Sequence, residues 1–361
     1  MNGNPRSDAL RRLLSARANL ESGHAGGTDC VRLSAGSIDG LPGLIVDRFG
    51  PLVVAVDYAG AKADRTKADR TAADGLTAPA LLHLLRSAFP EHHVVAKARS
   101  STDGTNQFVT AHEPAPAARL GATPLIATER GLKFEIGIEP AHDFGIYLDA
   151  AKARLFVREA ARGQRVLNLF SYTGAFGVAA AAGGAAEVTN VDPNRNYLAW
   201  SLRNAALNGV TMRVLPDTAQ DHLAKHLRRL ARNPEQPNYD LVIVDPPAFG
   251  VGRGNERVLR LLWPDLFASL RTMTPRQVVL MSNDKAFRSR QDFGELVQAR
   301  LGDLYRFNRL GTHLTPDDLA ADRPSLAWRP GGEDPYYVEP VVLTGMLLAT
   351  PPARFSGDRA R

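Results

Sequence analysis

The stretch from Arg165 to Asp192 constrains the fold most, because it predicts a strand, a turn, a helix and a second strand in close succession. Val166 to Phe170 is mainly apolar and is long enough for one buried strand. Ala175 to Ala182 consists almost entirely of small apolar residues, which suit a helix packed closely on a sheet, and Gly183-Gly184 ends that helix. Val188 to Val191 supplies the second strand. We therefore predict a βαβ unit.

The turn and the end of the second strand suggest a ligand. Gly174 lets a backbone approach a bound molecule where a Cβ atom would collide, and the helix that follows offers free N–H groups to an anionic part. Asp192 follows the second strand, 18 residues after Gly174, where a carboxylate can accept hydrogen bonds from a ribose diol. An adenosine-containing ligand is the first hypothesis, although a plain βαβ unit with an unrelated Asp gives the same pattern. Tyr172 stands where the dinucleotide motif GxGxxG has its first glycine, which disfavours a nicotinamide dehydrogenase.

Strands and helices alternate after this unit, which predicts a doubly wound sheet of parallel strands. Its further strands are expected over Met212 to Leu215, Asp240 to Val244, Gln277 to Met281, Tyr336 to Val338 and Val341 to Leu347. Its helices are expected over Tyr197 to Asn208, Asp221 to Arg232 and Glu256 to Thr272, and within Phe144 to Ala161, where Asp149 can serve as the N-cap. The strand ends carry the Ser171–Gly174 turn, Asp192, Asp217 and Asp245. Ligands lie beyond the carboxyl ends of such strands, so we expect these residues to converge on one crevice.

Asp245-Pro246-Pro247-Ala248-Phe249 is the most specific short motif in the chain. Two prolines directly after a strand make a stiff turn without N–H donors, so that its carbonyls remain available as acceptors. Phe249 can stack on a planar base that those acceptors orient. The motif therefore predicts a nucleobase site, and a rigid structural turn with a core Phe is the alternative.

Composition limits the remaining possibilities. The 44 Lys and Arg exceed the 38 Asp and Glu, and the resulting charge of +6 permits an RNA partner without requiring one. The single cysteine, Cys30, excludes a disulfide framework within the chain, and His142, His222, His226 and His313 show no metal-binding spacing. The N-terminus lacks the apolar stretch of a secretory signal, and no run is apolar enough to cross a bilayer. We expect a cytoplasmic protein with no membrane partner and no metal.

The residues before the βαβ unit predict a smaller α+β domain, so that the chain divides into domains over 1–130 and 131–361. A helix is expected over Ala9 to Leu20 and a hairpin of Leu44 to Phe49 and Leu52 to Tyr58 around Gly50-Pro51. A second helix is expected over Ala78 to Phe89, then a strand over His93 to Ala98 and a loop-rich segment over Ser100 to Pro124. Phe134 to Ile138 leads towards the βαβ unit. Residues 61–74 contain KADRT twice without apolar periodicity, which predicts a mobile insertion.

Several segments together resemble the bacterial 23S ribosomal RNA methyltransferases of the class I, Rossmann-like S-adenosylmethionine type. These segments are LNLFSYTGAFGVAAAAGGAAEVTNVD, FGIYLD and DLVIVDPPAFG, and VRLSAGSIDGLPGLIVDRFG is similar to the central domain of the 5-methylcytosine members. The resemblance covers most of residues 30–285. It implies S-adenosylmethionine as the cofactor and 23S ribosomal RNA as the partner.

Two departures bear on which base is modified. About 30 residues precede the central-domain segment, so the RNA-binding PUA module of the 5-methylcytosine members is expected to be absent. Those members use a cysteine nucleophile just after the fifth strand, because C5 of cytosine needs covalent activation. Here that segment reads Leu280-Met281-Ser282-Asn283-Asp284-Lys285, and with the following Ala286-Phe287 it is similar to segments of the 7-methylguanosine enzymes. We therefore expect direct SN2 transfer to a guanine nitrogen.

The resemblance also implies roles for individual residues. Asn168, Phe170 and Gly174 would line the methionine end of the cofactor, Asp192 would bind the ribose and Asp217 would lie near the adenine amine. The complete expected cofactor set is Tyr147, Asn168, Phe170, Ser171, Tyr172, Thr173, Gly174, Ala175, Asp192, Pro193, Asp217 and Asp245. The expected catalytic set is Asp245, Pro246, Pro247 and Phe249, and the expected RNA phosphate contacts are Arg253, Arg257, Lys285, Arg288 and Arg290.

Three alternatives stay open at this point. The chain could be a cytosine-C5 methyltransferase with a displaced nucleophile, a methyltransferase of a protein or small molecule, or a catalytically silent RNA-binding assembly factor. The Asp192 and Asp245-Pro246-Pro247 motifs argue against the silent factor. The sequence does not indicate an oligomeric state.

Overall fold

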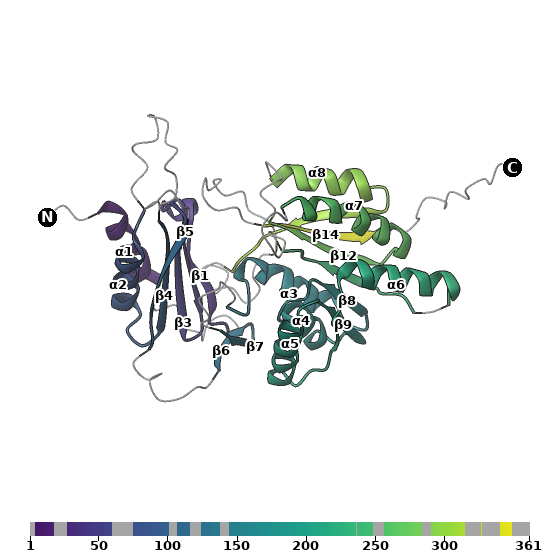
Figure 1. Ribbon diagram of the computed structural model, residues 1–361, viewed down its shortest axis with the longest axis horizontal. Coiled ribbons are helices and arrows are strands. Elements are labelled where there is room, and N and C mark those ends of the chain that lie inside the picture. Colours follow the sequence, from purple (N-terminus) through teal and green to yellow (C-terminus); the bar gives the residue numbers. More distant parts are fainter. Residues whose placement is uncertain are drawn as a thin grey trace. The chain divides into compact units, whose positions relative to one another are not determined.

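The computed structural model describes residues 4–17, 27–59, 75–100, 107–115, 124–137, 144–235, 237–247, 256–283, 290–314, 326 and 340–348. These residues form two compact units (Figure 1). The first contains the described residues up to Ala151, with His313 and Leu314, and the second contains those from Lys152 to Thr312, with Leu326 and 340–348. The predicted insertion at 61–74 and the predicted strand at Tyr336 to Val338 lie outside the described residues, and the predicted boundary near residue 130 stays a prediction.

The first unit is built on a five-stranded sheet with the strand order β1-β2-β3-β4-β5. Its strands are antiparallel neighbours except for the parallel pair β3 and β4. A separate two-stranded sheet pairs β6 with β7. The elements are α1 (Pro5–Arg17), β1 (Cys30–Ala35), η1 (Gly36–Asp39), β2 (Leu44–Phe49), β3 (Leu52–Asp57), α2 (Ala78–Ala88), β4 (His93–Ser100), β5 (Gln107–Glu113), β6 (Leu125–Glu129), β7 (Leu132–Ile136) and η6 (Leu148–Ala150).

The predicted hairpin around Gly50 and the predicted helix over Ala78 to Phe89 are confirmed. In the hairpin, β2 pairs with β3 in antiparallel register around Gly50, which adopts a positive φ of 54°. In the helix, α2 begins where the Thr77 hydroxyl accepts the Ala80 N–H, as an N-cap does. Helices α1 and α2 cover one face of the sheet, where Leu10, Leu81 and Leu85 are fully buried (Figure 1). These contacts form the core of the first unit.

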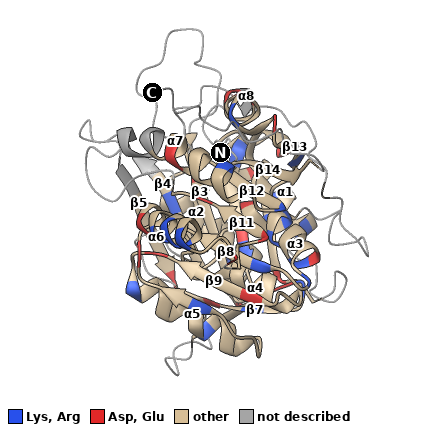
Figure 2. Ribbon diagram, turned by 90° about the vertical axis from the view of Figure 1, so that its right-hand side faces the viewer, with Lys and Arg blue, Asp and Glu red and all other residues tan. Residues whose placement is uncertain are grey.

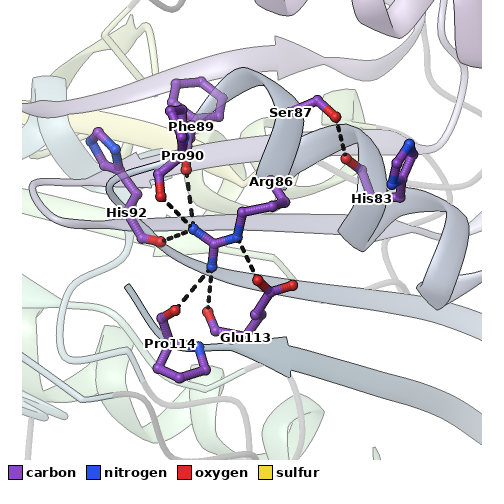
Figure 3. Close-up of polar contacts among 8 residues, drawn as sticks. All are labelled: His83, Arg86, Ser87, Phe89, Pro90, His92, Glu113 and Pro114. Carbon is purple, nitrogen blue, oxygen red and sulfur yellow. Dashed lines mark hydrogen bonds and ion pairs between the residues drawn. The ribbon is translucent and has the colours of Figure 1, made fainter. Parts of the chain in front are cut away.

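Arg86 ties the end of α2 to the sheet (Figure 3). Its guanidinium donates to the Glu113 carboxylate at 2.8 Å and to the carbonyl oxygens of Pro90 at 2.8 Å and His92 at 2.9 Å. It also donates to the carbonyls of Glu113 and Pro114, both at 3.1 Å. One planar side chain thus satisfies acceptors at the end of the helix, at the start of β4 and at the end of β5.

Two predictions for the first unit are wrong. The segment from Ser100 to Pro124 was expected to be loop-rich and no strand was predicted in it, but β5 pairs along its whole length with β4. Its residues QFVTAHE follow no clear alternation, and the backbone bonds to β4 fix the strand instead. Asp149 was expected to be an N-cap, but it lies inside the 3₁₀ turn η6, which runs directly into α3.

The second unit is a seven-stranded sheet with the order β10-β9-β8-β11-β12-β14-β13. The first five are parallel, and β14 runs antiparallel between β12 and β13. The doubly wound α/β prediction is therefore confirmed. The elements are α3 (Ala151–Ala160), β8 (Arg165–Leu169), α4 (Ala175–Ala182), β9 (Glu187–Val191), α5 (Arg195–Leu207), β10 (Arg213–Leu215), α6 (Ala219–Arg232), β11 (Leu241–Val244), α7 (Glu256–Met273), β12 (Gln277–Ser282), α8 (Arg290–Leu301), β13 (Tyr305–Leu310) and β14 (Val341–Leu347).

Helices cover both faces of this sheet (Figure 1). Side chains of α7 and α8, including the buried Trp263 and Phe293, pack with Val244 and Leu280 of the central strands into one hydrophobic core. Helices α4 and α5 lie on the opposite side, where α4 contacts β8 and β9. The central strands are buried on both faces, as their continuous apolar runs predict.

Candidate active site

The strands β9, β8 and β11 end at one level of the sheet. In β8, Leu169 pairs with Val191 of β9 on one side and with Val244 of β11 on the other. Asp192 directly follows β9 and Asp245 directly follows β11, the two neighbours of β8. Both acids therefore leave the sheet at the level where the turn after β8 begins. Strand order reverses between β8 and β11, because the chain runs outward through β9 and β10 before it returns to β11. This is the switch point at which open α/β sheets bind their ligands.

The turn after β8 has an unusual backbone. Phe170 and Tyr172 adopt positive φ angles of 56° and 48°, and Gly174 one of 77°. Non-glycine residues rarely occupy this region, and such residues cluster at functional sites because the surrounding structure must hold them there. The Tyr172 N–H donates to Asp192 Oδ2 at 3.0 Å, and the Ser171 N–H donates to the Val191 carbonyl at 3.0 Å. The end of β9 therefore fixes the turn.

Gly174 is required by packing within the protein. A Cβ atom at this position would lie 2.0 Å from Ser201 Oγ and 2.9 Å from Asn190 Nδ2. From the sequence, this glycine was expected to allow the approach of a ligand. The structure gives it two other reasons, the left-handed backbone and the close approach of α5.

A buried polar network supports the turn from behind. Asn168 Nδ2 donates to Asn190 Oδ1 at 3.0 Å, and Asn190 Nδ2 donates to Ser201 Oγ at 3.0 Å. Asn204 Nδ2 donates to the Thr173 carbonyl oxygen, also at 3.0 Å. All these side chains are almost completely buried, so each unmade bond would cost free energy. Asn190, Ser201 and Asn204 were not among the site residues predicted from the sequence.

Asp192 is a buried carboxylate at the centre of the site. Its side chain accepts the N–H groups of Tyr172 and Asn194, the latter at 2.8 Å, and the residue is 8% exposed. Burial raises the pKa of Asp192, and the two backbone hydrogen bonds act in the opposite direction. Each carboxylate oxygen has a second lone pair, which can accept a hydroxyl from a ligand.

The other expected residues differ in their surroundings. Asp217 pairs with Lys225 at 2.6 Å, and Asp217 Oδ1 also accepts the Thr218 N–H at 3.1 Å. Phe170 is partly buried against the core of the second unit, whereas Pro193 is exposed at the end of β9. Ala175 is partly exposed at the start of α4. Tyr147 belongs to the first unit and is 49% exposed.

The motif after β11 is described only in part. Asp245 is partly exposed, Pro246 is buried and Pro247 is exposed. Phe249, Arg253, Lys285 and Arg288 lie outside the described residues. Arg257 and Arg290 fall in α7 and α8, at positions where the structure gives the backbone only. The expected roles of these residues stay predictions.

Two negative findings apply to the described part of the chain. No group of three or more His, Cys, Asp or Glu there is arranged to hold a metal ion. None of the helices there is both long enough and apolar enough to cross a membrane.

Comparison with known proteins decides the family. The model of the S-adenosylmethionine-dependent methyltransferase family matches residues 47–274, which is more than half of the chain. The chain belongs to this family. S-adenosylmethionine is accordingly its cofactor.

Two ribosomal RNA large subunit methyltransferases I are among the similar proteins. The one from Erwinia tasmaniensis is 34% identical over 247 residues, covering 66% of this chain and 54% of that protein. The one from Klebsiella pneumoniae is 33% identical over 224 residues, covering 62% and 52%. The chain therefore spans about half the length of these curated relatives.

Solved structures share the fold at lower identity. A Streptococcus mutans protein described as an S-adenosylmethionine-dependent methyltransferase is 22% identical, with a TM-score of 0.65, covering 96% of this chain and 82% of that one. An S-adenosylmethionine-dependent methyltransferase from Agrobacterium tumefaciens is 19% identical, with a TM-score of 0.56 and coverages of 91% and 92%.

The residues present fit the family's cofactor. Ser171 Oγ and Asn168 Oδ1 are buried and have no hydrogen-bond partner among the described residues. A hydroxyl can donate to a carboxylate and an amide oxygen can accept from an ammonium group, and the methionine part of the cofactor carries both. The carboxylate of Asp192 suits its ribose. The unpaired groups and the acid thus match the two polar ends of this ligand.

Proposed function

We propose that this protein transfers the methyl group of S-adenosylmethionine to a base of ribosomal RNA in the cytoplasm, and that the acceptor is a guanine nitrogen of 23S ribosomal RNA. The observation that carries the proposal is the strand register that brings Asp245 and its two prolines beside the Ser171–Gly174 turn and Asp192. The names of the ribosomal RNA methyltransferase relatives support the substrate class.

The site divides the work between its two neighbouring strand ends. Asp192, Ser171 and Asn168 would hold the cofactor, which supplies a methyl group on a positively charged sulfur. Asp245 and the carbonyl oxygens of Pro246 and Pro247 would accept hydrogen bonds from the base, and Phe249 would stack on it. The cofactor would supply its methyl group directly to the guanine nitrogen that these acceptors orient, without a covalent intermediate on the protein. Orientation supplies most of the acceleration, because the sulfonium is already a good leaving group.

The single cysteine favours a nitrogen over cytosine C5 as the acceptor. Cys30 is the only cysteine in the chain, and it lies in β1 of the first unit with 1% of its surface exposed. Covalent activation of a cytosine needs an accessible thiolate in contact with the base. A sulfur buried in a sheet cannot serve this role without local unfolding, so direct transfer to nitrogen is the simpler chemistry.

A transfer experiment with competing acceptors tests the substrate class. The protein is incubated with methyl-labelled S-adenosylmethionine in three separate reactions. One contains ribosomal RNA from cells lacking their own modifications, the second contains ribosomal proteins and the third contains a small-molecule extract. We expect label in the RNA alone. Label in the protein or the extract would contradict the RNA assignment, and cofactor binding without any transfer would favour the silent assembly factor.

A further inference from the structure

An aromatic cluster lies beside the cofactor turn. The rings of Tyr172 and Tyr197 meet edge to face with centroids 4.6 Å apart, and Trp200 lies 6.4 Å from Tyr172. Arg203 continues the cluster along α5, with its guanidinium carbon 5.9 Å from the Trp200 ring centroid. We call these four residues the α5 aromatic surface.

This surface faces outward. Tyr172, Tyr197 and Trp200 are each partly exposed and Arg203 is exposed, and none of the four belongs to the hydrophobic cores of the described residues. The neighbouring Leu202 is 45% exposed. Aromatic side chains usually bury most of their large apolar area, so partly open rings grouped in this way call for a binding explanation.

Its position is tied to the cofactor site. The cap of α5 is Asn194, only two residues after Asp192, and the Asn194 N–H donates to that carboxylate at 2.8 Å. Tyr172 belongs to the strained turn, and its N–H donates to the same carboxylate. The aromatic rings therefore lie at the carboxyl edge of the sheet, where Asp245 also leaves β11.

The charged side chains of α5 all have one sign (Figure 2). Helix α5 carries Arg195 and Arg203, both exposed, and no acidic residue. The adjacent strand β10, which α5 contacts, adds the exposed Arg213. Stacking rings on a helix that carries cations and no acidic residue fit a single-stranded nucleic acid, whose bases offer aromatic faces and whose backbone is anionic. A duplex hides those faces within its own stack.

We propose that the α5 aromatic surface binds an unpaired segment of the RNA substrate and positions it for methyl transfer, with Trp200 and Arg203 as its main contacts. This inference rests on the proposed function and names the part of the RNA that the site engages. Trp200 and Arg203 act as positioning residues: they contact RNA outside the reacting base and do not contact the cofactor.

Binding of labelled RNA to the full-length chain tests this proposal. Affinity is measured by fluorescence anisotropy, in the presence of S-adenosylhomocysteine, for an unstructured oligonucleotide and for a hairpin of the same length. Trp200→Ala and Arg203→Ala should each weaken binding of the unstructured RNA on the order of tenfold and leave the hairpin much less affected. Trp200→Phe should restore most of the affinity, and Arg232→Ala, an exposed arginine of α6, should cost less than Arg203→Ala.

The outcomes separate this inference from the proposed function. Calorimetry with S-adenosylhomocysteine should show unchanged cofactor binding in each variant, which also establishes that the site is folded. If the wild type methylates RNA and Trp200→Ala keeps its affinity for RNA and its KM, the surface assignment is wrong while the function stands. If the wild type binds unpaired RNA through Trp200 but methylates only protein, the proposed function and the positioning role are wrong, and only the RNA-binding assignment of the surface stands. Equal affinity for hairpin and unstructured RNA, or no RNA binding at all, would overturn the surface assignment.

Discussion

The Tyr172 N–H donates to the Asp192 carboxylate at 3.0 Å, and this one bond joins the turn after β8 to the end of β9. The second oxygen of the carboxylate accepts the Asn194 N–H, so Asp192 also holds the start of α5. A residue predicted to bind a ribose therefore has a structural role in addition to any role toward a ligand.

Asp192→Asn removes the negative charge of this side chain and nearly keeps its shape, so it tests what the charge contributes to stability and to cofactor binding. An amide has one acceptor oxygen and one NH₂ group, so one of the two backbone N–H groups would face another donor. We expect the free energy of unfolding to fall by about 1–3 kcal/mol and cofactor affinity to fall at least about tenfold. Urea denaturation and calorimetry measure these quantities, with the exposed Asp265→Asn as the control. Unchanged values in both would show that the carboxylate has neither role.

Gly174→Ala should be much more harmful than a comparable change elsewhere. Gly163 has a similar φ of 69°, but a Cβ there would have no neighbour within 4 Å, whereas a Cβ at Gly174 would lie 2.0 Å from Ser201 Oγ. Gly163→Ala therefore reports the backbone cost alone, about 1–2 kcal/mol. We expect Gly174→Ala to cost at least about 2 kcal/mol more in urea denaturation and to abolish cofactor binding. Equal costs at the two positions would mean that the turn can move away from α5.

The unfolding free energy should decrease on mild acidification because of a histidine pair in α6. His222 and His226 are buried, with stacked rings and centroids 6.4 Å apart, and burial together with the charge of His226 lowers the pKa of His222 to about 4. A histidine whose folded pKa lies below its unfolded value of about 6.5 contributes stability that is fully present above pH 6.5 and is lost as the pH falls toward 4.

The size of this loss can be measured by urea titrations across that range of pH. The pKa difference of His222 corresponds to on the order of 3 kcal/mol over the whole interval. His222→Gln should flatten the pH dependence, because glutamine can still bond to the Tyr239 hydroxyl, which lies 3.3 Å from the His222 ring nitrogen. The matched control is the separate single variant His83→Gln, because His83 is exposed on α2. An equally steep pH profile in the His222 variant would assign the effect to other groups.

Arg86→Lys should loosen the first unit even though the positive charge is kept. A lysine ammonium cannot replace the planar guanidinium, which donates both to Glu113 and to several carbonyl groups. We expect a loss of about 1–3 kcal/mol, seen as faster hydrogen exchange in β5. Arg11→Lys, at an exposed pair with Asp8, should change little. Unaltered exchange in β5 would show that the Arg86 contacts do not hold that strand.

The local pattern around the cofactor turn could be predicted because each element there is a continuous apolar run with a clear stop. Helix α4 spans Ala175–Ala182 as expected, and the paired strands fix Asp192 and Asp245 at one edge. The supporting network could not be predicted, since Asn168, Asn190 and Ser201 come together only through the sheet and α5. A buried Asn in a strand is the only sequence signal that this network leaves.

Helix α8 and strand β13 of the second unit were not predicted either, and for a different reason. Helix α8 buries Phe293, Val297 and Leu301 at helical spacing, but polar residues and Gly294 surround them and weaken the pattern. Strand β13 is an edge strand whose partner β14 follows more than 30 residues later, so its pairing is long-range. Neither the helix nor the strand changes the position of the candidate site.

Asp245→Ala should abolish methyl transfer while leaving the fold intact. Removal of the group that we propose orients the base should lower the rate at least about a hundredfold, because misplacement of the acceptor by even a small distance is costly. Transfer is measured with labelled cofactor, and calorimetry checks cofactor binding in the same variant. Asp265→Ala should retain full activity, and full activity of Asp245→Ala would remove Asp245 from the site.

The most direct test of the central claim is to identify the methylated nucleoside. Unmodified ribosomal RNA is incubated with the protein and labelled S-adenosylmethionine, digested to nucleosides and analysed by mass spectrometry. We predict label in 7-methylguanosine or N2-methylguanosine, as expected for direct transfer to a guanine nitrogen. Label in 5-methylcytosine would contradict the account, because it would require a covalent route that the buried Cys30 does not provide.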